Sequence, residues 1–267
     1  MKNLIALILL AVPIFAQDDR LDELPFDDEP LQAESKSYFA IAGGYTFNVG
    51  MINLDEVNNF FSKFAPTLDN TEYQLGELSS PLIMHGGGGF TGIPFWKNIR
   101  IGFEAWAGSA ETDEVSVMNE ELSLISKGEF NVAMTALHAD YGFVITDGLA
   151  VLAGMKLGWS GLNMIYSLSE PNYNWETLGS DTNLNMVEID KSWLFVAPQV
   201  SIDWAATGFL MFSLNASYNI NFDNPFLDDF EKNWKINRTA SLDNVPTDLN
   251  IDQLNVRLGV YLGLFNY

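Results

Sequence analysis

The stretch FLMFSLNASYNINF, residues 209–222, decides the fold. Two sets of side chains alternate along it. One face holds Leu210, Phe212, Leu214, Ala216, Tyr218, Ile220 and Phe222, and the other holds Ser213, Asn215, Ser217, Asn219 and Asn221. A period of two is typical of a β-strand, whose successive side chains point to opposite faces. A soluble sheet with one wet face gives the same pattern. The run is longer than a usual strand of about five or six residues, and its length favours a tilted strand that crosses a bilayer.

Seven further segments show the same alternation: residues 38–51, 82–91, 98–109, 129–144, 151–160, 194–204 and 255–267. Two of them are less regular. The second contains His85 and four consecutive glycines, and the fourth changes phase near Thr135, which predicts a β-bulge there. The chain is therefore expected to be all-β, with about eight strands.

The connections between these segments alternate in length. Short turns occur at 92–94, 146–148 and 205–208, whereas long polar stretches occur near 54–79, 110–127, 167–190 and 223–252. Outer-membrane barrels have short periplasmic turns and long external loops. An unpaired backbone amide in hydrocarbon costs several kcal/mol, so strands cross a bilayer only as a closed sheet. We predict a single closed, antiparallel, up-and-down transmembrane β-barrel over residues 37–267.

The N-terminus has the features of an export signal. Met1 and Lys2 precede an apolar stretch at residues 4–15, and Ala16 is a small residue at the expected cleavage site. An uncleaved anchor is the alternative, but the apolar stretch is too short to span a bilayer. We predict a signal peptide over residues 1–16 and an acidic, flexible periplasmic leader over residues 17–36.

Charge and composition exclude several kinds of function. The formal net charge of −22 argues against binding to nucleic acid, and the acidic residues concentrate outside the apolar segments. The chain has no cysteine and two histidines, so we expect no disulfide, no thiolate chemistry, no metal site and no cofactor.

Aromatic residues are expected to form two girdles where the barrel meets the headgroups on either side. The prediction places Trp96, Trp204 and Phe209 near the short-turn rim. It places Trp159, Trp193 and Tyr218 near the long-loop rim.

Charged residues on the polar faces of the strands are expected inside the barrel, where they need partners. We predict an ion-pair network of Arg100, Glu104, Lys156, Asp203 and Arg257, with small residues leaving room for these side chains. The alternative is that some of them face a water-filled vestibule.

Enzyme motifs are weak. Gly87-x-Gly89-x-x-Gly92 matches a dinucleotide fingerprint in form but is followed by no helix. His138 and Asp140 could form a histidine–carboxylate pair, yet no positioned nucleophile can be named. We predict a non-enzymatic protein. Residues 57–64 allow a short helix that caps the barrel mouth, engages a partner, or packs on its own rim.

The end of the chain resembles the assembly signal of outer-membrane barrels, whose pattern is polar-x-Gly-x-x-hydrophobic-x-hydrophobic. Arg257, Gly259, Leu262 and Leu264 fill the pattern, and the chain ends in Tyr267, three residues beyond it, where the family often stops sooner. The architecture resembles the small OmpA/OmpX-type barrels. This resemblance implies insertion by the barrel-assembly machinery and residence among the lipids of the outer membrane of a Gram-negative-type envelope.

These observations favour a structural or surface-interaction protein that meets an extracellular partner through its acidic loops. A narrow porin-like channel for small or hydrophobic solutes is the alternative, and it would require ten or more strands or a less crowded interior. A soluble periplasmic β-protein is a third hypothesis.

Overall fold

The computed structural model describes residues 37–64, 66–68, 71–118, 123–170, 185–247 and 249–267. The predicted signal peptide and leader, residues 1–36, lie outside the described residues. No helix within the described ranges is long and apolar enough to cross a membrane.

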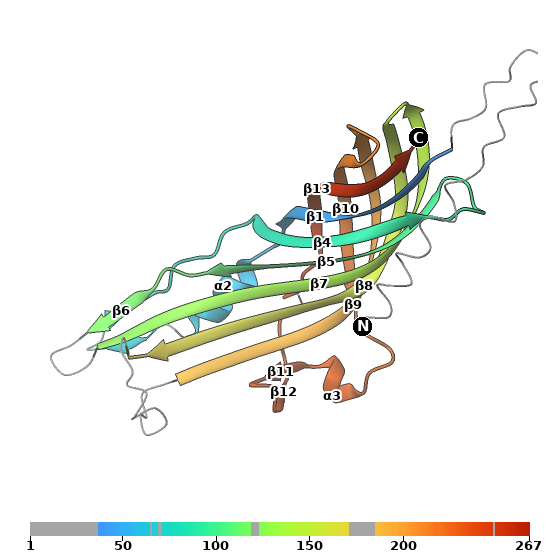
Figure 1. Cartoon of the computed structure of the whole chain (residues 1–267). Helices are drawn as coiled ribbons and strands as arrows, with labels where there is room; N and C mark the ends of the chain where they lie inside the picture. The colour runs from blue at the N-terminus through green and yellow to red at the C-terminus, as the bar shows by residue number, and fades with distance from the viewer. Residues whose placement is uncertain (1–36, 65, 69–70, 119–122, 171–184, 248) are drawn as a thin grey trace, which may run out of the picture. The chain divides into compact units, whose positions relative to one another are not determined.

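Eight long strands among the described residues form a ring of antiparallel neighbours (Figure 1). They are β1 (Phe39–Met51), β4 (Leu82–Gly92), β5 (Ile99–Glu111), β7 (Ser123–Thr146), β8 (Leu149–Ser169), β9 (Asn185–Ala205), β10 (Leu210–Phe222) and β13 (Gln253–Asn266). β13 pairs with β1, and pairing of β10 with both β9 and β13 completes the ring. The predicted all-β fold with eight principal strands is confirmed.

The β9–β10 contact is the least regular part of the ring. Its register runs from Met211↔Ala205 to Ser217↔Gln199 and resumes at Ile220↔Val196. Pro198 lies in the interval, and proline has no N–H to donate to the ladder. The ring is therefore completed without an even set of hydrogen bonds at this position.

Side chains alternate between the two faces of the ring in the manner of a membrane barrel. Leu137 and Leu157 point outward and are 58% and 56% exposed. Their neighbours His138 and Lys156 point inward and are buried. Apolar side chains outside and charged side chains inside invert the usual arrangement of a water-soluble protein.

Three strands continue beyond the ring at the end of the long connections. β7, β8 and β9 are 24, 21 and 21 residues long, and Figure 1 shows them projecting past their neighbours. β6 (Val115–Met118) pairs with β7, β11 (Trp234–Ile236) pairs with β9, and β12 (Ala240–Leu242) pairs with β11. This external sheet is open, with β6 at one edge and β12 at the other.

The remaining elements belong to the long connections. α2 (Asp55–Ser62) and the small hairpin of β2 (Thr67–Leu68) and β3 (Thr71–Glu72) follow β1, and α3 (Asp229–Lys232) follows β10. The predicted helix at 57–64 thus corresponds to α2, which begins two residues earlier.

The phase change predicted near Thr135 is wrong. Alternate residues of β7 stay on the inner face throughout, and its register shift lies between Val144 and Thr146. The inner residues are Phe130, Val132, Met134, Ala136, His138 and Asp140. The inner face of β7 changes from apolar to polar along the strand. In the sequence, this change looks as if the apolar residues had moved from one face of the strand to the other.

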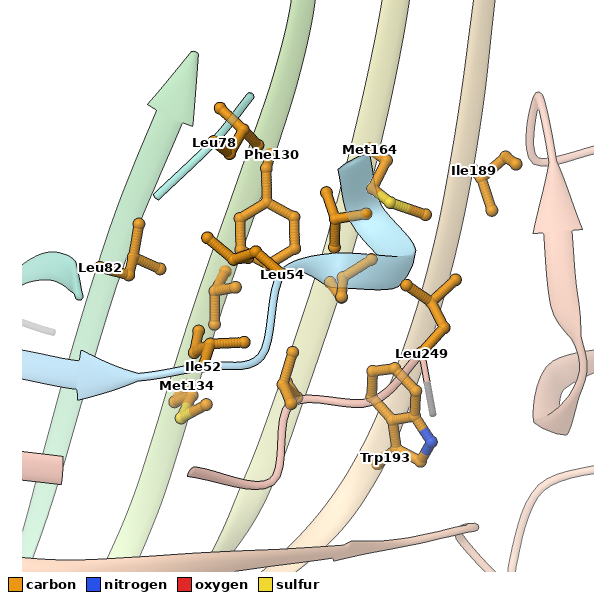
Figure 2. Close-up of a cluster of buried hydrophobic side chains, with 14 of the residues drawn as sticks. Ile52, Leu54, Leu78, Leu82, Phe130, Met134, Met164, Ile189, Trp193 and Leu249 are labelled. Carbon is orange, nitrogen blue, oxygen red and sulfur yellow. The ribbon is translucent and has the colours of Figure 1, made fainter. Parts of the chain in front are cut away.

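The interior toward the long connections is therefore an apolar core. Figure 2 shows Leu54, Phe130, Met134 and Met164 gathered between α2 and the strands. Phe61 of α2 is 2% exposed, and a Cβ atom at Gly128 would lie 2.7 Å from its ring. α2 fills this half of the interior and packs directly on the barrel wall.

Candidate functional site in the barrel interior

The half of the interior toward the short turns, here called the polar half, holds a set of charged side chains beside a buried cluster of Tyr38, Ala40, Phe90, Ala150, Leu152, Met211 and Tyr261. Arg100 of β5 lies over the ring of Phe90, 4.3 Å from its centroid. The side chain of Arg100 is 2% exposed. Its Nε atom donates to Asp140 Oδ2 of β7 at 2.9 Å, and its Nη1 atom donates to Asp203 Oδ2 of β9 at 2.6 Å. β7 and β8 separate β5 from β9 in the ring, so the contact with Asp203 crosses the lumen.

A second cluster surrounds Glu104, which lies four residues after Arg100 on the same face of β5. Lys156 Nζ of β8 lies 2.6 Å from Glu104 Oε1, and Arg257 of β13 pairs with Glu104 Oε2. β1 and β4 separate β13 from β5 in the ring. All three side chains are at most 4% exposed, so this cluster also crosses the lumen.

Two amides connect the clusters. Gln199 donates to Asp140 Oδ1 at 2.5 Å, and Asn215 donates to Gln199 Oε1 at 2.9 Å. Lys156 Nζ lies 3.5 Å from Asn215 Oδ1. The structure thus places all five residues of the predicted charge network in one continuous set of contacts.

The prediction omitted the groups that balance and connect the charges. Asp140, Gln199 and Asn215 all lie on the inner face of their strands. The alternation placed Gln199 and Asn215 on that face, but it does not show which side chains from separate strands meet. Asp140 was considered only as a partner of His138.

Glycines make room for these side chains. A Cβ atom at Gly102 would overlap the ring of His138, and one at Gly154 would overlap the carboxylate of Asp140. Close packing inside the wall therefore requires residues without side chains at these positions.

The histidine–carboxylate pair of the sequence is present in the structure. His138 Nδ1 lies 2.8 Å from Asp140 Oδ2, the same oxygen that Arg100 contacts. Ser213, a hydroxyl on this level, donates to Asp203. No described hydroxyl hydrogen-bonds to His138, so the pair lacks the nucleophile contact that a hydrolytic triad needs. The described residues also contain no group of three or more side chains that could hold a metal ion.

The girdle residues face outward with one exception. Trp96, Trp159 and Trp204 are 60%, 56% and 55% exposed, and Phe209 is 63% exposed. Tyr218 is 48% exposed and also points outward.

The girdle assignment of Trp193 is wrong. Trp193 is 6% exposed and packs edge-on against Trp234, with ring centroids 5.5 Å apart. It occupies the same face of β9 as the buried Phe195. Its position along β9 was compatible with a girdle. However, the odd-numbered residues of this part of β9 point inward, so the side chain of Trp193 lies in the apolar core.

The residues of the resembled assembly signal lie in or just after β13. Arg257 faces the interior, Gly259 is on the same face, and Leu262 and Leu264 face outward at 63% and 59% exposure. Tyr267 follows the strand, and its ring stacks on buried Tyr38 at 4.6 Å. Their role in assembly stays a prediction.

Comparisons with known proteins find similar chains among solved structures but none by sequence. No family model matches the sequence, and no curated protein matches it. A major outer membrane protein from Thermus thermophilus shares 9% identity over 84% of this chain and 99% of that chain, with a TM-score of 0.42. Ail, the attachment invasion locus protein of Yersinia pestis, shares 8% identity over 87% and 99%, with a TM-score of 0.31. OprG from Pseudomonas aeruginosa shares 13% identity over 87% and 96%, with a TM-score of 0.33.

The class of the protein follows from its own geometry. A ring of eight antiparallel strands with apolar residues outside and charged residues inside is a small β-barrel of the outer-membrane type. The low identities and TM-scores of the comparisons add nothing about its activity.

Proposed function

We propose that this chain resides in the outer membrane as a closed, non-conducting barrel with a structural or surface-interaction role. The observation that carries the proposal is the filled lumen. Arg100 and Glu104 bind carboxylate and cationic partners across the polar half, and α2 fills the apolar half.

A continuous solute path would have to disrupt both halves. Separating one partner of a buried ion pair costs about 3–5 kcal/mol, because a charge is left without compensation. The α2 side of the interior would also have to expose Phe61 and its apolar neighbours to water. The narrow-channel alternative therefore has less support than a closed barrel.

The connection between β10 and β13 is the candidate interaction surface. Pairing of β11 with β9 holds it, and Asn237 N donates to Glu188 O at 2.8 Å. Phe226 is 89% exposed in this connection, near Asp228 and Asp229. An exposed aromatic side chain among carboxylates suits a partner with an apolar contact and a basic rim.

Planar-bilayer recording of the purified full-length protein tests the closed lumen. We expect no stable unitary steps from preparations that show the heat-modifiable migration of a folded barrel. Reproducible unitary steps from such preparations would reject the non-conducting barrel and favour the channel.

Binding of intact cells to a surface coated with a basic extracellular protein tests the interaction surface. Phe226→Ala should reduce binding, whereas Phe209→Ala should not. Phe209 is a matched control because it is 63% exposed at the opposite, short-turn rim. Equal binding by both variants would contradict the assignment of the surface.

A further inference from the structure

One cavity on the outer wall lies over five neighbouring strands. It is a trough of about 840 Å³ on the outward faces of β4, β5, β7, β8 and β9, which lie side by side in Figure 1. Its floor follows the strand register: His85↔Ala107, Ala107↔Ala133, Ala133↔Gly161 and Gly161↔Ser192. Neighbouring strands are about 4.8 Å apart, so the floor is about 19 Å long.

The two long sides of the trough differ in chemistry. On the side of the external sheet, the register aligns Ser109, Asn131, Asn163 and Asp190. On the side of the short turns, it aligns Ala105, Thr135, Trp159 and Leu194. The trough therefore has a wall of amides, a hydroxyl and a carboxylate. Beyond its opposite edge, outside its lining, lies this row of largely apolar residues, here called the apolar wall.

This position is the boundary between the lipid-facing band and the polar external part. Below the trough, Phe103, Leu137 and Leu157 are more than half exposed on the outer face. Beyond the polar wall, the outward residues include Glu111 and Glu129. Lipid headgroups occupy this boundary in a membrane barrel, so the natural occupant of the trough is a headgroup.

The charges around the trough disfavour a phosphate. Lys191 pairs with Asp223 at 3.0 Å, and Arg238 pairs with Glu188 at 2.7 Å. Both cations that line the trough are thus already neutralised. Asp190 adds a carboxylate to the wall, and like charges repel an anionic group.

The hydrogen-bonding groups suit hydroxyls instead. Ser109 and Asn131 line the trough, and the hydroxyl of Ser109 can both donate and accept a hydrogen bond. Asn131 offers both a donor and an acceptor. At the end of the floor, Tyr45 Oη contacts His85 Nδ1 and leaves Nε2 of the same ring for a ligand.

We propose that the trough binds the uncharged sugar headgroup of a membrane lipid, whose acyl chains run over Trp159 and the apolar wall. This inference rests on the proposed membrane residence. It adds a specific lipid class and a site that the filled interior does not provide.

Native mass spectrometry of the full-length protein in nanodiscs tests the proposal. The nanodiscs contain equal amounts of phosphatidylcholine, phosphatidylglycerol and a diglucosyl diacylglycerol. We expect the released protein to retain the glycolipid over both phospholipids. Ala133→Phe fills the floor and should reduce this preference about tenfold, the effect of losing one or two hydrogen bonds.

Ala153→Phe is the matched control. Ala153 also points outward, on β8, about 26 Å from Gly161 along the strand, and its substitution should preserve the preference. Asn131→Leu removes the amide and keeps a side chain of similar volume. If Ala133→Phe does not form a heat-modifiable barrel, the glycolipid preference of Asn131→Leu is the test of the proposal.

Three results would overturn the trough as a glycolipid site: preferential retention of phosphatidylglycerol, unchanged glycolipid retention in Asn131→Leu and folded Ala133→Phe, or displacement of the lipid by free maltose at equal concentration. The last would identify a free-sugar site. Failure of the wild-type protein to enter nanodiscs at all would instead refute the membrane residence.

Discussion

Replacement of Arg100 by methionine should strongly destabilise the barrel. Methionine keeps most of the apolar length of the side chain but removes the guanidinium that contacts Asp140 at 2.9 Å and Asp203 at 2.6 Å. These carboxylates are 1% and 0% exposed, so solvent cannot compensate for the loss. The substitution leaves two buried negative charges beside each other.

The expected loss is about 3–5 kcal/mol in the free energy of unfolding, the range for breaking a buried ion pair from one side. The lower end of the range is the better expectation, because each carboxylate keeps other donors. Gln199 still donates to Asp140, and Ser213 still donates to Asp203 at 2.7 Å.

Urea unfolding in detergent micelles, followed by tryptophan fluorescence, measures the effect. Arg238→Met is the control, because this side chain is 71% exposed in its pair with Glu188. An exposed pair contributes about 0–1 kcal/mol, so the control should change little. Adding Asp203→Asn to Arg100→Met should recover part of the stability by removing one uncompensated charge.

Equal unfolding free energies for Arg100→Met and Arg238→Met would refute the reasoning. That result would mean that water reaches Asp140 and Asp203 and that the polar half of the lumen is a wet vestibule.

Further predictions concern orientation and packing. Brominated phospholipid should quench the fluorescence of Trp159, so Trp159→Phe should reduce the total quenching of tryptophan fluorescence. Trp193→Phe should leave the quenched fluorescence unchanged. The reverse result would contradict the assignment of Trp159 to the outer face and Trp193 to the inner face. Phe61→Ala should cost about 3–5 kcal/mol in urea unfolding, because it opens a cavity under α2, and a loss below about 1 kcal/mol would show that the helix is not packed there. Gly102→Val should cost about 1–3 kcal/mol by overlapping His138, and wild-type stability in the same assay would contradict the close contact.

The strands were predictable because apolar side chains occupy the outer face of the ring at every second residue. Residues 213–222 show the full alternation, and β10 (Leu210–Phe222) contains all of them. β7, β8 and β9 were predicted too short, since their outward residues become polar toward the long connections and the alternation of hydropathy fades. Where both faces of a strand carry polar residues, the sequence has no alternation of hydropathy that would show where the strand ends.

The interior was less predictable because two different environments share one face. Met134 and His138 both point inward, although one lies in the apolar core and the other in the charge network. Trp193 was misplaced for a related reason, as its partner Trp234 comes from a connection whose path the sequence does not reveal. The charges of the network could be identified, but the amides that connect them depend on which strands face each other.

The open external sheet has a consequence for association between molecules. Within the ring of eight described strands every strand has two neighbours, so the ring offers no free backbone edge to another chain. β6 and β12 end the sheet on either side outside that ring. Among the described strands of this sheet, free backbone edges for pairing with another molecule therefore lie at β6 and β12, on the side of the long connections.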